Sequence, residues 1–161
     1  MIIFLTKDKR YARGVTHTST RKVDYIIPDR IDIQCEIQPV PFSDISTTKP
    51  GEPSSEIRRR VIAARAIQEE RYKDFKDIHC NAQMTESMIH KYAEPDEAGF
   101  RLLSNAMERL SLSARAYSRI LKVARTIADL DASADVKPIH LAEAIAYRSL
   151  DRGDWAERPY R

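Results

Sequence analysis

Apolar and polar side chains alternate with a period of two at one convincing place in the chain. The segment IDIQCEI, residues 31–37, places an apolar side chain at every second position. This period is typical of a half-buried strand, and Pro39 and Pro41 are expected to end it. Residues 42–54 are rich in Ser, Thr, Pro and Gly, which indicates a linker and a domain boundary near residue 50.

Beyond residue 50 the apolar positions recur every three or four residues, which predicts helices. The first is expected to be capped by Ser54 or Ser55 and to run through residue 75. Four more follow: a short one after Thr85, a third with Pro95 in its first turn, a fourth capped by Ser111 or Ser113, and a fifth that begins near Pro138. The predicted inward face of the first helix contains Ile57, Val61, Ala64 and Ile67.

The composition is that of a globular protein. Of the 161 residues, 42% are hydrophobic and 32% are charged, and no apolar run approaches the roughly 18 residues that span a bilayer. The opening MIIFLT is too short for a signal peptide, so we expect a cytoplasmic protein without membrane contact. Cys35 and Cys80 have no spacing typical of a zinc site and are expected to be reduced thiols.

The net charge of +3 is unevenly distributed. Residues 1–30 contain seven Lys or Arg and three Asp. A basic first segment of this kind can contact nucleic acid, or it can simply be solvated.

Several kinds of active site are excluded by what the sequence lacks. Glycine occurs only at positions 14, 51, 99 and 153, so the chain contains neither a GxxxxGK[ST] phosphate loop nor a GxGxxG fingerprint. The four histidines have no metal-ligand spacing, and no GxSxG elbow marks a nucleophile. We therefore expect no metal site and no complete catalytic centre.

The fourth predicted helix, in the segment LSARAYSRILKVARTIADLD, is unusual because Arg115 lies in its first turn. An arginine there is unfavourable by a few tenths of a kcal/mol unless an anion offsets it, as a phosphate would. Arg119 and Lys122 continue a cationic stripe, which can equally be a solvated face. Arg125 and Asp129, four residues apart, are predicted to form a surface ion pair.

Together with that segment, DRIDI, EIRRRVIAARAIQEERY and HLAEAIAYRSLDR resemble the C-terminal part of the magnesium-chelatase-like AAA+ ATPases, the ComM and YifB group. The resemblance covers roughly residues 29–153. It implies a mainly α fold, namely a helical bundle of the AAA+ lid type preceded by a short extended segment or strand. Residues 1–50 would be an N-terminal segment with one strand, the end of an ATPase core, and residues 51–161 the lid.

The resemblance also implies roles for two arginines. Arg115 matches the sensor-2 arginine, which reaches from the lid towards the γ-phosphate of ATP. Arg30 in DRID matches the arginine finger presented to the nucleotide of a neighbouring subunit. From the residues alone, Arg30 is more simply a strand-edge arginine paired with Asp29 or Asp32.

On this reading the chain supplies Arg115 to ATP and Mg²⁺ held by a P-loop core, in a DNA-remodelling motor related to competence. The complete protein would be a homo-oligomeric ring with ATPase activity, and this chain alone would be inactive because it lacks the P-loop. The alternative is a helical domain that binds nucleic acid or another protein and has no ATPase role.

Overall fold

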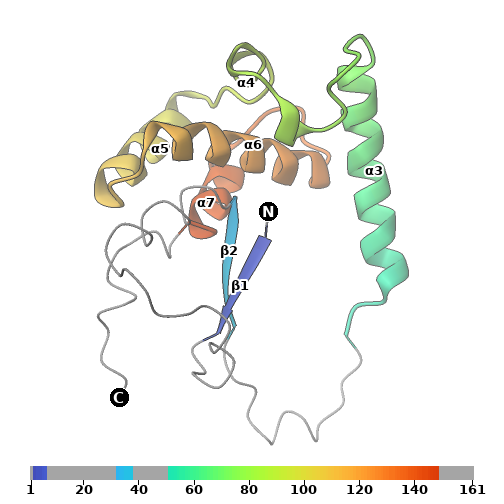
Figure 1. Cartoon of the computed structure of the whole chain (residues 1–161), viewed down its shortest axis with the longest axis horizontal. Helices are drawn as coiled ribbons and strands as arrows, with labels where there is room; N and C mark the ends of the chain where they lie inside the picture. Colours follow the sequence, from blue (N-terminus) through green and yellow to red (C-terminus); the bar gives the residue numbers. More distant parts are fainter. Residues whose placement is uncertain (1, 7–31, 38–50, 149–161) are drawn as a thin grey trace, which may run out of the picture.

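The computed structural model describes residues 2–6, 32–37 and 51–148. It contains two strands and a group of helices, drawn in Figure 1. The elements are β1 (Ile2–Thr6), β2 (Ile33–Ile37), α3 (Ser54–Tyr72), the 3-10 helix η3 (Asn81–Gln83), α4 (Glu86–Tyr92), α5 (Glu97–Arg109), α6 (Ala114–Leu130) and α7 (Pro138–Ala146). The predicted fold class, mainly α after a short strand, is confirmed.

Local capping sets several helix starts. Asp96 precedes α5 and its carboxylate accepts a hydrogen bond from the Gly99 N–H. Ser113 does the same for α6, with its hydroxyl accepting from the Ala116 N–H. Of the two caps considered for this helix, Ser113 is therefore the one used. The predicted cap of α3, Ser54 or Ser55, was wrong. Pro53 occupies the cap position, and Ser54 is already helical.

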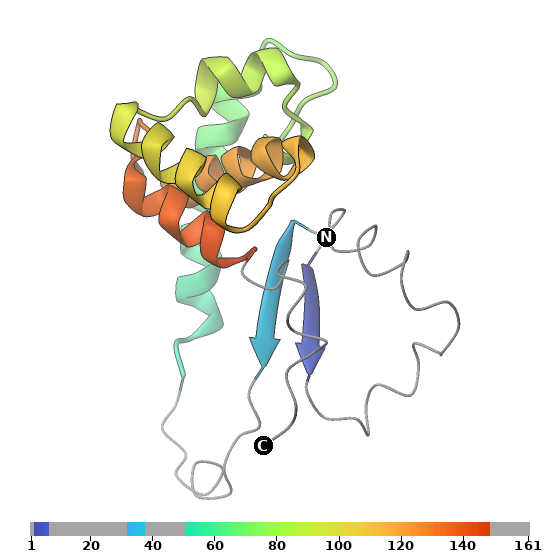
Figure 2. The ribbon, with the colours of Figure 1, turned by 90° about the vertical axis from the view of Figure 1, so that its left-hand side faces the viewer.

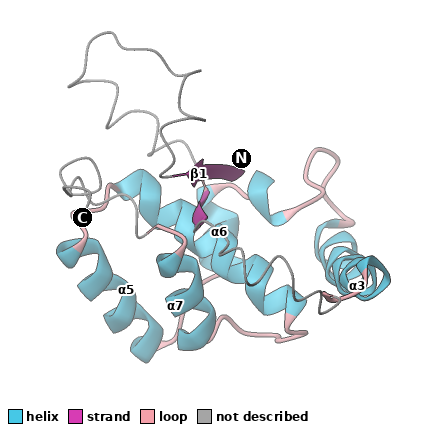
Figure 3. Cartoon of the chain, turned by 90° about the horizontal axis from the view of Figure 1, so that it is seen from below, coloured by secondary structure: helices cyan, strands magenta, loops and turns pink. Residues whose placement is uncertain are grey.

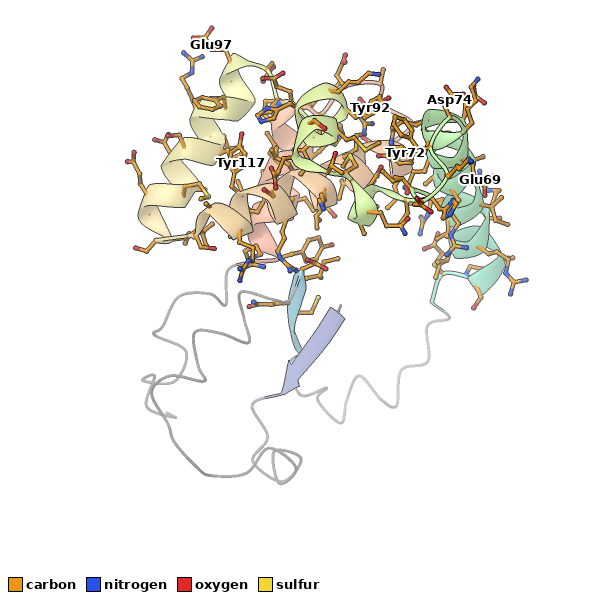
Figure 4. The ribbon with its side chains drawn as sticks, turned by 45° about the horizontal axis from the view of Figure 1, so that its top comes forward. Glu69, Tyr72, Asp74, Tyr92, Glu97 and Tyr117 are labelled. Carbon is orange, nitrogen blue, oxygen red and sulfur yellow. The ribbon has the colours of Figure 1, made fainter. Side chains whose placement is uncertain are left out.

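The core lies around α6, which contacts α3, η3, α4 and α7. Figure 3 shows α5 and α7 side by side beneath it. Leu103, Ile120, Leu121 and Leu141 are among the fully buried side chains at the centre. At one edge, Tyr72 of α3 and Tyr92 of α4 meet edge to face with ring centroids 5.9 Å apart, as Figure 4 shows.

The strands form a two-stranded parallel sheet in which Ile2 pairs with Ile33 and Thr6 with Ile37. β2 confirms the predicted strand, whereas β1 was not predicted because MIIFLT shows no alternation. The sheet is joined to the helices where the Gln34 N–H donates to the Tyr147 carbonyl at 3.0 Å, just after α7. The division of the chain at residue 50 stays a prediction.

The predicted inward face of α3 is only half covered. Ala64, on that face, is buried along with Gln68 and Tyr72, but Ile57 and Val61 are 44% and 41% exposed. The reason is visible in Figure 1, where the first half of α3 extends beyond the other helices. Among the described residues, none of the helices has both the length and the apolar character needed to cross a membrane.

Candidate functional site

The first turn of α6 combines an arginine with a helix N-terminus, and both features suit an anion. Arg115 is its second residue, and its side chain is exposed. The turn contains no acidic residue, so no carboxylate of α6 itself offsets the positive end of the helix dipole. The Arg115 guanidinium and the positive end of the helix dipole therefore lie at the same end of α6, an arrangement that suits phosphate.

Arg115 lies on the wall of a groove of about 1150 Å³ that runs along α6 towards the start of β2 and the end of α7. Its polar lining is mixed in charge rather than uniformly cationic. The charged side chains are Arg115, Arg119, Lys122, Asp32, Glu86 and Glu143.

Arg119 and Lys122, the other residues of the predicted cationic stripe, bind groups on neighbouring elements. The Arg119 guanidinium forms an ion pair with the carboxylate of Asp32, directly before β2. The Lys122 ammonium donates to the Ala82 carbonyl of η3 at 3.1 Å. Both cations therefore connect α6 to other parts of the fold.

The largely apolar side chain of Tyr117 lines the same groove as Arg115. Burial raises the pKa of its phenol, and the negative charges of Glu94 and Glu86 raise it further. Glu86 also accepts a hydrogen bond from the Ser118 hydroxyl at 2.8 Å. Tyr117, labelled in Figure 4, consequently stays neutral at physiological pH and contributes no charge to the groove.

The prediction of a surface ion pair between Arg125 and Asp129 was wrong. Arg125 is 1% and Asp129 2% exposed, and the Arg125 Nε donates to Asp129 Oδ1 at 3.1 Å in the interior. Arg71 of α3 donates to Asp129 Oδ2 at 2.8 Å, and so does the Asn81 amide. The sequence carried a signal of this burial, since Arg125 and Asp129 follow Leu121 at intervals of four along the buried face.

Charge and hydrogen bonding keep the Asp129 carboxylate ionised. Burial by itself would raise the pKa of Asp129, but the hydrogen bonds from Arg71 and Asn81 and the charges of Arg125 and Arg71 outweigh it, so the pKa lies below the ordinary 3.8. The same interaction with Asp129 raises the pKa of Arg71. This network of Arg71, Asn81, Arg125 and Asp129, the Asp129 network, joins α3, η3 and α6.

The second predicted site residue, Arg30, lies outside the described residues. Its role as an arginine finger therefore stays a prediction. The first described residue after it in the sequence is Asp32. Within the described ranges, no group of three or more His, Cys, Asp or Glu could hold a metal ion. Cys35 and Cys80 are not disulfide-bonded.

Comparison with known proteins places the chain in a family. The family model described as "Magnesium chelatase, subunit ChlI C-terminal" matches residues 51–148. YifB of Escherichia coli is 38% identical over 125 residues, and the competence protein ComM of Haemophilus influenzae 37%; each match covers 77% of this chain and 24% of the relative. An uncharacterized protein of Mycobacterium tuberculosis is 28% identical over 120 residues, which are 74% of this chain and 24% of that protein.

The chain spans about a quarter of the length of these relatives. The family match covers most of the chain and begins three residues before α3. The chain therefore belongs to the family of the magnesium chelatase subunit ChlI C-terminal domain and corresponds to the C-terminal region of the magnesium-chelatase-like AAA+ proteins of the ComM and YifB group.

Proposed function

We propose that the helical domain is the lid of a magnesium-chelatase-like AAA+ ATPase and that Arg115 contacts the γ-phosphate of ATP bound by a P-loop core. One observation carries the proposal: Arg115 is exposed in the first turn of α6, a helix whose first turn contains no acidic residue, on the wall of the groove. The resemblance of SARA to the sensor-2 motif supports the same role.

Two contributions make this position effective. A guanidinium can bind a phosphate through two parallel hydrogen bonds, and the helix N-terminus adds partial positive charge beside it. Both are fixed before the reaction, so they stabilise charge on the transferring phosphoryl group without reorganisation. Arg115 would thus orient the γ-phosphate and stabilise its negative charge.

The rest of the nucleotide site would come from the core. ATP bound as its Mg²⁺ complex supplies the transferable phosphoryl group, and this chain has no phosphate loop to hold it. The described residues also lack a cluster of three or more His, Cys, Asp or Glu that could hold a metal ion. We therefore assign the binding of Mg²⁺ to the core. Arg30 would act on the nucleotide of a neighbouring subunit, which requires a homo-oligomeric ring.

DNA remodelling is the proposed use of this ATPase activity. It is supported by the similarity to a protein named for competence. The alternative, a nucleic-acid-binding domain without an ATPase role, rested partly on the cationic stripe of α6. It receives less support from that stripe, because Arg119 and Lys122 are engaged by Asp32 and the Ala82 carbonyl.

The test is the steady-state ATPase activity of the complete protein that contains this domain, with Arg115→Ala compared with Arg101→Ala. Arg101 is a suitable charge-matched control because it forms an exposed ion pair with Glu97 on α5. Arg119 is not suitable, since its ion pair joins α6 to the segment before β2.

We expect Arg115→Ala to lower turnover roughly a thousandfold while leaving the unfolding midpoint unchanged, because the side chain is exposed. Arg101→Ala should keep near-normal turnover. Equal rates for the two variants would refute the sensor-2 role.

A further inference from the structure

The first half of α3 has no described partner for its apolar side chains. Every residue from 54 to 63 is exposed, whereas Ala64, Gln68 and Tyr72 in the second half are buried against the other helices. Figures 1 and 2 show the same arrangement from two directions: the N-terminal end of α3 projects away from the helical domain.

The exposed apolar residues continue the buried face. At 100° per residue, Ile57, Val61, Ala64, Gln68 and Tyr72 lie within an arc of about 80° on the helix. Ile57 is 44% and Val61 41% exposed, so the pair forms an uncovered extension of the same face, which we call the α3 strip. Most helical stability in proteins comes from packing of an apolar face, so a partner that covered the α3 strip would stabilise the first half of α3.

Within the described residues, the sheet consists of two strands. β1 and β2 are parallel, and parallel sheets normally have both faces covered and more than two strands. In both Figure 1 and Figure 2 the two strands and the free half of α3 extend from the same side of the helical domain. A domain that completed the sheet would therefore be on the side on which the α3 strip is exposed.

We propose that the α3 strip is the docking surface for the P-loop core that completes the sheet. The identification of the occupant rests on the proposed function. It is supported by the length of the relatives, of which this chain spans 24%. Arg58 and Arg60 flank the strip on the helix, so the facing surface of the core should be apolar at its centre with carboxylates at its rim.

The experiment is amide hydrogen exchange of the α3 backbone in the 161-residue chain and in the complete protein that contains this domain together with its core. We expect the amides of residues 57–63 to exchange roughly tenfold or more slowly in the complete protein, because docking would suppress local opening. Ile57→Asp combined with Val61→Asp should abolish this protection.

Ile62→Asp is the matched control, since Ile62 is 59% exposed and lies about 120° from the centre of the strip. It should retain the protection. Equal exchange in the two wild-type proteins would overturn the proposal, as would equal loss in the double variant and the control. Protection that appears in the 161-residue chain alone and grows with its concentration would also overturn it, because the occupant would then be a second copy.

Failure of this proposal can be told apart from failure of the proposed function. Arg115→Ala lies outside the α3 strip and should leave the exchange of residues 57–63 unchanged. A complete protein with normal protection and an inert Arg115→Ala substitution would retain the docking surface while losing the sensor-2 role.

Discussion

Gly99 lies where α5 packs tightly against Leu141 of α7. A Cβ atom at this position would lie 2.7 Å from Leu141 Cδ1 of α7 and 2.9 Å from Pro95 Cβ. Leu141 is fully buried and has little space to move. The absence of a side chain at Gly99 therefore sets how closely α5 can pack on α7.

At this residue we predict that Gly99→Ala destabilises the protein. Alanine would gain about 1 kcal/mol in helix propensity, but overpacking at a tight contact costs about 1–3 kcal/mol, so the free energy of unfolding should fall by up to about 2 kcal/mol. Chemical denaturation measures the change. Gly51→Ala is the control, because a Cβ there meets nothing within 4 Å, and it should change stability by less than about 0.5 kcal/mol. Equal effects of the two substitutions would contradict the packing argument.

At the scale of elements, the Asp129 network determines how α3 is held against α6. The Asp129 side chain is fully buried and is hydrogen-bonded by Arg71, Asn81 and Arg125. We predict that Asp129→Asn lowers the free energy of unfolding by about 3–5 kcal/mol, because two arginines would lose their buried counter-charge. Equilibrium denaturation is the measurement, and Arg101→Ala, on the surface, should change it by less than about 0.5 kcal/mol.

The same network predicts a pH dependence. Because the pKa of Asp129 is lower in the folded chain than in the unfolded chain, its contribution is complete above the ordinary aspartate pKa and is lost as the pH falls through about 4 and below. The stability of Asp129→Asn should therefore fall less steeply over this acid range than that of the wild type. Parallel curves for the two proteins would show that Asp129 is not responsible for this part of the acid sensitivity.

At the scale of the whole molecule, the interactions that join the described strands to the helical domain include the backbone bond from Gln34 to Tyr147 and the Asp32–Arg119 ion pair. We predict that Asp32→Arg and Arg119→Asp each destabilise the chain and that combining them recovers part of the loss. The coupling energy should be about 1 kcal/mol, since the pair is partly exposed. A double-mutant cycle on the unfolding free energy measures it, and strictly additive losses would show that the pair contributes nothing.

Asp32 also relates the two predicted site residues to each other. It follows Arg30 by two positions and is bound to Arg119, one turn after Arg115 on α6. Asp32, two positions after the predicted finger, is thus attached to the helix that contains the proposed sensor-2 arginine. Under the proposed function, the groove along α6 and the α3 strip would be two separate surfaces through which this domain faces the core.

The sequence by itself determined the features that depend on neighbouring residues. Periodicity predicted the helices beyond residue 50 and the strand β2, and a serine was correctly expected as the cap of α6. The family was also recognisable from short motifs. These signals are legible because helix and strand periods and capping bonds involve residues only a few positions apart.

Only the tertiary structure decided which predicted faces are covered. It left Ile57 and Val61 exposed, buried Arg125 with Asp129, and paired β1 with β2. Arg71 and Asp129 are 58 positions apart, and Asp32 and Arg119 are 87 positions apart. The physical reason is that burial and ion pairing depend on which distant segments meet, whereas the periodicity of a helix or strand shows only that one of its faces is apolar.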